Sequence, residues 1–136
     1  MVKSKPFTMR LTSDMEQWVE HEAQRTRRSK GAIVEALADE GMRMRRFPGI
    51  AFRGPDDGRR AWLLGTAFDV WEAIQGHQDF GSVELLLAAG DLPEAPLRLA
   101  LAYYAAYPTE IDRAIADNRI DYEHARLLYP TLFAAD

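Results

Sequence analysis

The chain has 136 residues, of which 47% are hydrophobic and 28% charged, a composition typical of a globular protein with one ordinary domain or two small ones. No apolar run approaches the ~18 residues that span a membrane, and the N-terminus has no apolar stretch of signal-peptide length, so we expect a cytoplasmic protein. The absence of cysteine excludes disulfides, thiolate catalysis and cysteine-ligated zinc.

The net charge of −4 is divided unevenly along the chain. Residues 1–46 carry ten Lys and Arg against seven Asp and Glu, a net charge of +3, whereas residues 47–136 carry seven against fourteen, a net charge of −7. A basic segment suits a polyanion, and an acidic segment suits a basic protein surface. The alternative is a solvated surface whose charge is simply uneven.

Residues 7–11 show the alternation of a half-buried β-strand. Phe7, Met9 and Leu11 alternate with Thr8 and Arg10. The sequence that follows is helical in pattern and offers no neighbouring strand, so the backbone groups of this segment need a partner from elsewhere. We expect the strand to pair with its own copy across a two-fold axis.

Two helices are predicted after this strand. Ser13 and Glu16 have the spacing of a capping box, which predicts a helix over 14–26, and Ser29 is expected to cap a second helix over 30–46. The expected buried stripes are Met15, Trp18, Val19 and Ala23 on the first helix, and Ile33, Val34, Leu37, Ala38 and Met42 on the second. Because about 45 residues rarely bury enough apolar surface to fold alone, we predict an intertwined dimer.

Two stretches of this segment match a known pattern. They are Phe7-Thr8-Met9-Arg10-Leu11-Thr12 and Arg28-Ser29-Lys30-Gly31-Ala32-Ile33, and through them residues 5–44 resemble the ribbon-helix-helix family of bacterial repressors and antitoxins. The resemblance implies a homodimer whose two-stranded ribbon enters the major groove of double-stranded DNA. Pro6 departs from the family, which usually carries a polar or basic reader there, so two readers remain in each chain.

The expected DNA contacts fall into two groups. Thr8 and Arg10 face outward on the ribbon, where Arg can bond bidentately to guanine, so they are the candidate base contacts. The candidate phosphate contacts lie around the start of the second helix, where backbone N–H groups are free. They are Arg28, Ser29, Lys30 and Gly31. Alternatively, Thr8 and Arg10 are only the polar face of an edge strand, and Ser29 is only a cap.

The second half of the chain begins at the Phe47-Pro48-Gly49 boundary signal. Residues 50–53 and 59–64 are expected to form a hairpin around the five-residue loop 54–58. Helices should follow, capped by Thr66 or Asp69 and by Ser82, then a helix over 93–107 that Pro108 ends, and a last helix capped by Thr109. We predict a mainly α protein with an N-terminal ribbon-helix-helix domain (1–46), a domain of hairpin and helical bundle (47–118) and an amphipathic tail (119–136).

Residues 82–107 have the helix, glycine-containing turn and helix of a helix-turn-helix motif. Residues 49–115 also look like a small bacterial family of uncharacterised domains of helix-turn-helix type, common in antitoxins. The matching words are Gly65-Thr66, Asp69-Val70-Trp71, Leu97-Arg98-Leu99-Ala100-Leu101-Ala102-Tyr103-Tyr104 and Glu110-Ile111. Helix 93–107 carries Glu94 and Arg98 but no lysine, so we expect that it does not read DNA.

The tail contains apolar and aromatic residues in a polar background. They are Tyr122, Leu127, Leu128, Tyr129, Leu132 and Phe133. These side chains either pack on their own domain or lie in the groove of a partner, here a toxin, as aromatic anchors often do.

No catalytic, metal or cofactor site is evident, because His21, His77 and His124 lack a second ligand at metal spacing, and we do not expect an enzyme. The leading hypothesis is a DNA-binding repressor that is also the antitoxin of a type II toxin-antitoxin pair. Resemblance to the second family implies a PIN-like ribonuclease as the toxin. The alternative is a stand-alone regulator whose C-terminal domain binds a ligand or stabilises the dimer, and a third hypothesis is an RNA-binding or scaffolding protein. Whether dimers assemble further stays open.

Overall fold

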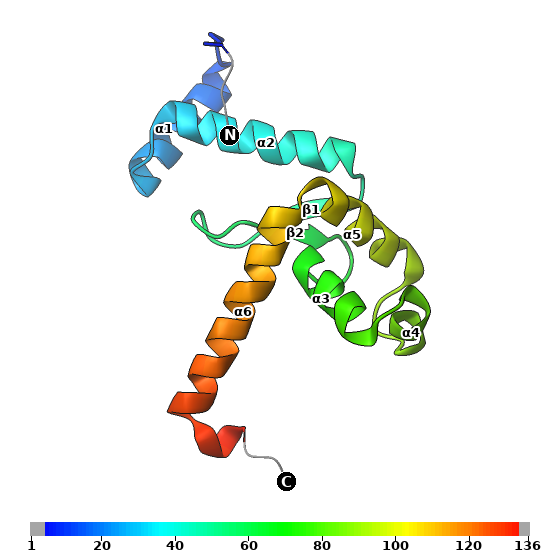
Figure 1. The fold of residues 1–136 in the computed structure, drawn as a ribbon. Helices are drawn as coiled ribbons and strands as arrows, with labels where there is room; N and C mark the ends of the chain where they lie inside the picture. The colour runs from blue at the N-terminus through cyan, green and yellow to red at the C-terminus, as the bar shows by residue number, and fades with distance from the viewer. Residues whose placement is uncertain (1–4, 134–136) are drawn as a thin grey trace. The chain divides into compact units, whose positions relative to one another are not determined.

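The computed structural model describes residues 5–133 as a mainly helical protein with one small antiparallel hairpin (Figure 1). The chain divides into two compact units, the first ending at Met42 and the second beginning at Arg43. The division lies inside a helix, a few residues before the boundary expected at residue 47. Within 5–133, no helix is both long and apolar enough to cross a membrane.

The first unit contains α1 (Ser13–Thr26) and most of α2 (Lys30–Arg46). Both helices lie within one residue of the predicted ranges. The cap of α1 was misassigned, because Thr12 and not Ser13 is the N-cap: the Thr12 hydroxyl accepts a hydrogen bond from the Met15 N–H at 3.3 Å. Three successive residues, Thr12, Ser13 and Asp14, can each cap a helix, so local sequence alone left the choice between them open.

The predicted strand over 7–11 is not formed in the single chain, where residues 6–12 have no regular secondary structure. The only strands among residues 5–133 are β1 and β2 of the second unit, which pair with each other. A strand needs a neighbour for its backbone N–H and C=O groups, and one chain supplies none to this segment. The ribbon therefore stays a prediction about the dimer.

The hairpin of the second unit pairs β1 (Ile50–Arg53) with β2 (Arg60–Leu63), in the register Ile50 to Leu63 and Arg53 to Arg60. It lies where the sequence predicted it, although the loop is longer by one residue because β2 begins at Arg60. The buried ends of the two strands, Ile50 and Leu63, join the hydrophobic core.

Helix α3 (Val70–Phe80) is central to the second unit and packs against β2, α4 (Val83–Ala88), α5 (Glu94–Ala106) and α6 (Pro108–Leu128). Ser82 caps α4 as predicted, through a hydrogen bond from the Leu85 N–H. Gly81 ends α3 with φ of +85°, a left-handed conformation that favours glycine. The core gathers apolar side chains from the hairpin and from α3 to α6.

The C-terminal part of the chain differs most from the prediction. Pro108 ends α5 but is also the first residue of α6, with Tyr107 as N-cap, so Thr109 is not the cap. Proline suits the first helical position, where its missing N–H costs nothing. Helix α6 then runs without a break to Leu128 and is followed by the 3-10 helix η1 (Pro130–Leu132). The expected domain boundary at 118/119 therefore falls inside α6, because no helix breaker occurs between Pro108 and Pro130.

Candidate functional site

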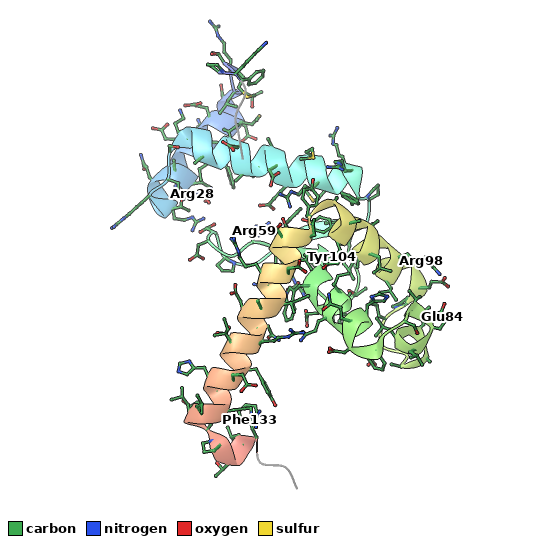
Figure 2. The ribbon with its side chains drawn as sticks, in the orientation of Figure 1. Arg28, Arg59, Glu84, Arg98, Tyr104 and Phe133 are labelled. Atoms are coloured by element: carbon green, nitrogen blue, oxygen red, sulfur yellow. The ribbon has the colours of Figure 1, made fainter. Side chains whose placement is uncertain are left out.

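The α1–α2 turn of the first unit gathers the cations that were expected to contact phosphate. Arg27 is the one non-glycine residue of the described chain with positive φ (56°), and its N–H donates to Ala23 O, which closes α1. This tight turn places Arg28 directly before the start of α2, as the label in Figure 2 shows.

The start of α2, where phosphate contacts were expected, is a helix N-terminus capped by Ser29. The Ser29 hydroxyl accepts a hydrogen bond from Ala32 N at 3.1 Å, and the Ser29 carbonyl accepts one from Ile33 N. The N–H groups of Lys30 and Gly31 are in the first helical turn and have no intrahelical acceptor. Ser29 is confirmed as a cap, and the helix start leaves backbone donors available beside it.

The cations around this helix start are partly engaged within the unit. Lys30 forms an ion pair with Glu16 of α1, and Arg28 donates to the Ala32 carbonyl at 3.4 Å. Arg25 pairs with Glu22 on its own helix. A polyanion that binds here therefore competes for Lys30 with at least one carboxylate of the unit, that of Glu16.

The two expected base contacts, Thr8 and Arg10, are exposed in the single chain. Their apolar neighbours are exposed as well, since Phe7 keeps 84% and Met9 50% of its surface accessible. Of the three apolar residues of the alternation, only Leu11 is partly buried in the single chain. The predicted alternation requires a surface that only another molecule can supply.

The helices of the first unit also lack cover. Val19 and Ile33 are its only buried hydrophobic residues among those described. Four large apolar residues of the expected stripes remain about half exposed: Met15, Trp18, Leu37 and Met42.

A polar cluster around the buried Tyr103 joins the last turn of α2 to α5 and α6 within the second unit. Tyr103 is fully buried, and its hydroxyl donates to Glu110 at 2.8 Å and accepts from Arg43 at 2.9 Å. Arg43 also donates to Glu110 and lies over the ring of Tyr107, 3.9 Å from its centroid. Arg46 donates to the Tyr107 hydroxyl at 2.9 Å.

The electrostatics of this cluster favour a neutral Tyr103 and a charged Arg43. Burial raises the pKa of Tyr103, the hydrogen bond to Glu110 raises it further, and Arg43 only partly opposes this. Burial lowers the pKa of Arg43, but its hydrogen bonds to Glu110 and Tyr103 outweigh that effect and the pKa is raised. The arrangement is that of a structural clasp.

Asp69 forms a second buried clasp at the start of α3. It is 3% exposed and accepts hydrogen bonds from Arg53 at 2.8 Å and from Arg60 at 2.7 Å, one from each strand of the hairpin. Its own N–H donates to the side chain of Glu72, as in a capping box. The carboxylate therefore fastens the hairpin to α3, a role beyond the helix cap that the sequence predicted for Asp69.

A groove of about 790 Å³ lies between the hairpin loop, the start of α3 and α6. Its walls carry both signs of charge, with Arg59 and Arg60 on the hairpin side and Asp117 and Asp121 on α6. Among residues 5–133, no group of three or more potential ligands could hold a metal ion.

The expected partner-binding residues of the tail lie on the last turns of α6 and on η1. Five of them are at least half exposed: Tyr122, Leu127, Leu128, Tyr129 and Leu132. Phe133, labelled in Figure 2, packs edge-on against Tyr122 with ring centroids 5.3 Å apart. These side chains therefore lie outside the core of their own unit. Ile120 is also exposed, at 66%, and was not among the residues predicted from the sequence to bind a partner.

Comparison of the chain with protein-family models, with curated proteins and with solved structures finds no match.

Proposed function

We propose that this protein is a sequence-specific DNA-binding repressor that acts as an antitoxin, with a ribbon-helix-helix head and a C-terminal part that binds a toxin. The observation that carries the DNA-binding part of this proposal is that the first unit lacks a strand partner and cover for its apolar face. Two helices joined by a cationic turn follow a segment that has no strand partner among residues 5–133, and only Val19 and Ile33 of the described part of this unit are buried. A second copy would supply both the missing strand and the missing cover.

The proposed DNA contacts follow from this dimer. Pairing of residues 7–11 with their copy would turn Phe7 and Met9 toward the helices and leave Thr8 and Arg10 on the outer face of the ribbon. Such a ribbon fits the major groove, where Arg10 can bond to guanine. The N–H groups at Lys30 and Gly31, with Arg28 beside them, suit a backbone phosphate.

The second unit is proposed to serve another partner. Its α4 and α5 are arranged as helix, turn and helix, which supports the helix-turn-helix expectation only in outline, because α4 has six residues. The one basic residue on α5, Arg98, forms an ion pair with Glu94 and presents little positive charge to DNA. The acidic surface and the exposed end of α6 suit a protein partner, for which we propose a toxin of the PIN-like ribonuclease class.

The test of DNA reading is Arg10→Ala measured against Arg119→Ala, a control that removes the same charge from α6. We expect Arg10→Ala to weaken binding to the chain's own promoter by about 1–3 kcal/mol while binding to unrelated DNA changes little. Arg119→Ala should alter neither. Equal loss on both DNAs would make Arg10 a phosphate contact, and no promoter binding by the unaltered protein would reject the repressor.

The test of antitoxin activity is purification of the protein encoded beside this chain, after co-expression, through a tag on that neighbour alone. Recovery of the full chain in a complex that also binds the promoter is the expected result. If the chain binds the promoter but not the neighbour, it is a stand-alone regulator.

A further inference from the structure

The core of the second unit ends halfway along α6. Ile111 and Ile115 are buried, but no residue from 116 to 133 is. The helix nevertheless continues to Leu128, and Figure 1 shows its C-terminal half extending clear of α3, α4 and α5. The packed first half of α6 nucleates the second half, whose large apolar side chains lack cover from their own unit.

The exposed half carries large apolar side chains on opposite sides. Tyr122 and Tyr129 are seven residues apart and continue the line of Ile115 along one side. Ile120 and Leu127 are also seven apart, but each is two residues from a tyrosine, which places them about 200° around the helix. Both sides are open: Ile120 is 66% and Leu127 81% exposed on one side, and Tyr122 is 50% and Tyr129 57% exposed on the other.

A third side of the same segment is acidic. Asp117 and Asp121 are one helical turn apart, both are exposed, and both line the open groove opposite Arg59 and Arg60. Neither forms an ion pair with another described residue, whereas Glu123 on the far side pairs with Arg126 at 3.7 Å. Two adjacent unpaired carboxylates complement a positively charged surface.

We propose that the C-terminal half of α6, together with η1, inserts into a concave apolar groove with a basic rim on a protein partner. This inference rests on the proposed antitoxin function and identifies how the toxin would be held. A flat surface or a single helix covers only one side of a helix, and this one is apolar on two. A second copy is also a poor occupant, because its Asp117 and Asp121 would bring like charges to the pair.

Helix η1 shapes the inserted element. The chain turns at Tyr129 and Pro130, and Phe133 comes back to lie against Tyr122. This folded end presents Leu132, 77% exposed, beside the helix end. The partner therefore meets a preformed hook, which lowers the ordering cost of binding.

The experiment uses the full chain and its neighbour-encoded protein, with double substitutions on each side of the helix. Ile120→Ser with Leu127→Ser changes one apolar side, Tyr122→Ser with Tyr129→Ser changes the other, and Asp117→Asn with Asp121→Asn removes the carboxylates. The control is Leu85→Ser, which removes an apolar side chain of similar exposure (57%) from α4. Dissociation constants, promoter affinity and the mass of the chain alone are measured for each.

Each apolar pair should weaken the complex by about tenfold or more, and the carboxylate pair should weaken it most at low salt. Leu85→Ser should have no effect, and promoter affinity should be unchanged throughout. If only one apolar side matters, the partner surface is flat and the groove is rejected. If a variant changes the mass of the chain alone, the occupant is a second copy. If the unaltered chain binds the promoter but not the neighbour, the antitoxin proposal itself fails.

Discussion

Tyr103 donates a hydrogen bond to Glu110 across 2.8 Å, although its ring is fully buried in the core of the second unit. The same hydroxyl accepts from Arg43, so one atom joins the end of α2 to α5 and α6. Removing this hydroxyl leaves Arg43 and Glu110 each with one hydrogen bond fewer. Tyr103→Phe should therefore lower the free energy of unfolding by about 1–3 kcal/mol, measured by urea denaturation.

Tyr104→Phe is the matched control for that substitution. Its hydroxyl also donates to a carboxylate, that of Asp112 at 2.6 Å, but the contact is exposed. Loss of this contact should change the unfolding free energy by less than about 0.5 kcal/mol. Equal effects of the two substitutions would show that the Tyr103 cluster adds no stability of its own.

The raised pKa of Tyr103 predicts a loss of stability at alkaline pH. The unfolded chain ionises this tyrosine near the ordinary value of 10.0, whereas the folded protein holds it protonated to higher pH. The stabilisation is complete below pH 10 and is lost as the pH rises from there toward the folded-state pKa. Urea midpoints should fall above pH 10, and less steeply for Tyr103→Phe. Ionisation of all five tyrosines with native helicity retained would contradict this.

Asp69 should be among the most sensitive positions of the second unit. Asp69→Asn keeps the shape but removes the charge that holds Arg53 and Arg60, and we expect a loss of about 2–4 kcal/mol in thermal or urea unfolding. The control is Glu94→Gln, which breaks an exposed pair with Arg98 and should cost less than about 0.5 kcal/mol. If Asp69→Asn leaves the free energy of unfolding unchanged, the hairpin is held by apolar packing alone.

The first unit should depend on self-association. Leu37→Glu places a charge on the uncovered apolar face, where Leu37 is 47% exposed in the single chain. We expect a monomer whose helicity is reduced, measured by sedimentation and circular dichroism. Gln24→Glu adds the same charge at an exposed polar position of α1 and should leave the dimer intact. A monomeric unaltered protein would reject the proposed dimer.

We expect the native Glu16 side chain to weaken DNA binding, because its carboxylate pairs with Lys30 at the proposed phosphate-binding site. Glu16→Gln frees the ammonium group and removes a negative charge beside the phosphate, so affinity should rise several-fold and the salt dependence should steepen by about one counterion. Glu20→Gln, one turn further along the exposed surface of α1, is the control for net charge. If both raise affinity equally, only the overall charge matters.

Local signals in the sequence predicted most of the secondary structure. Residues close together in the sequence were enough to predict several features: the Ser29 and Ser82 caps, the hairpin and the range of α2. The errors also lie where local signals compete, at Thr12 beside Ser13 and at Pro108, which can end one helix and begin the next.

The residue pairings in the two clasps, around Tyr103 and around Asp69, could not be predicted from the sequence. Arg43 and Glu110 are 67 residues apart, and Asp69 meets Arg53 and Arg60 only because the hairpin folds onto α3. Charge patterning shows which residues need partners but not which partner each one finds, since that depends on how the helices pack.

Residue type and spacing were enough to predict the helices, the Ser29 and Ser82 caps and the two differently charged halves. They could not show that α6 extends beyond its own core and exposes apolar residues on opposite sides, since where burial ends depends on how far the neighbouring helices reach. Tertiary packing likewise decided that residues 7–11 have no strand partner in one chain, because a strand exists only where another backbone satisfies its hydrogen bonds.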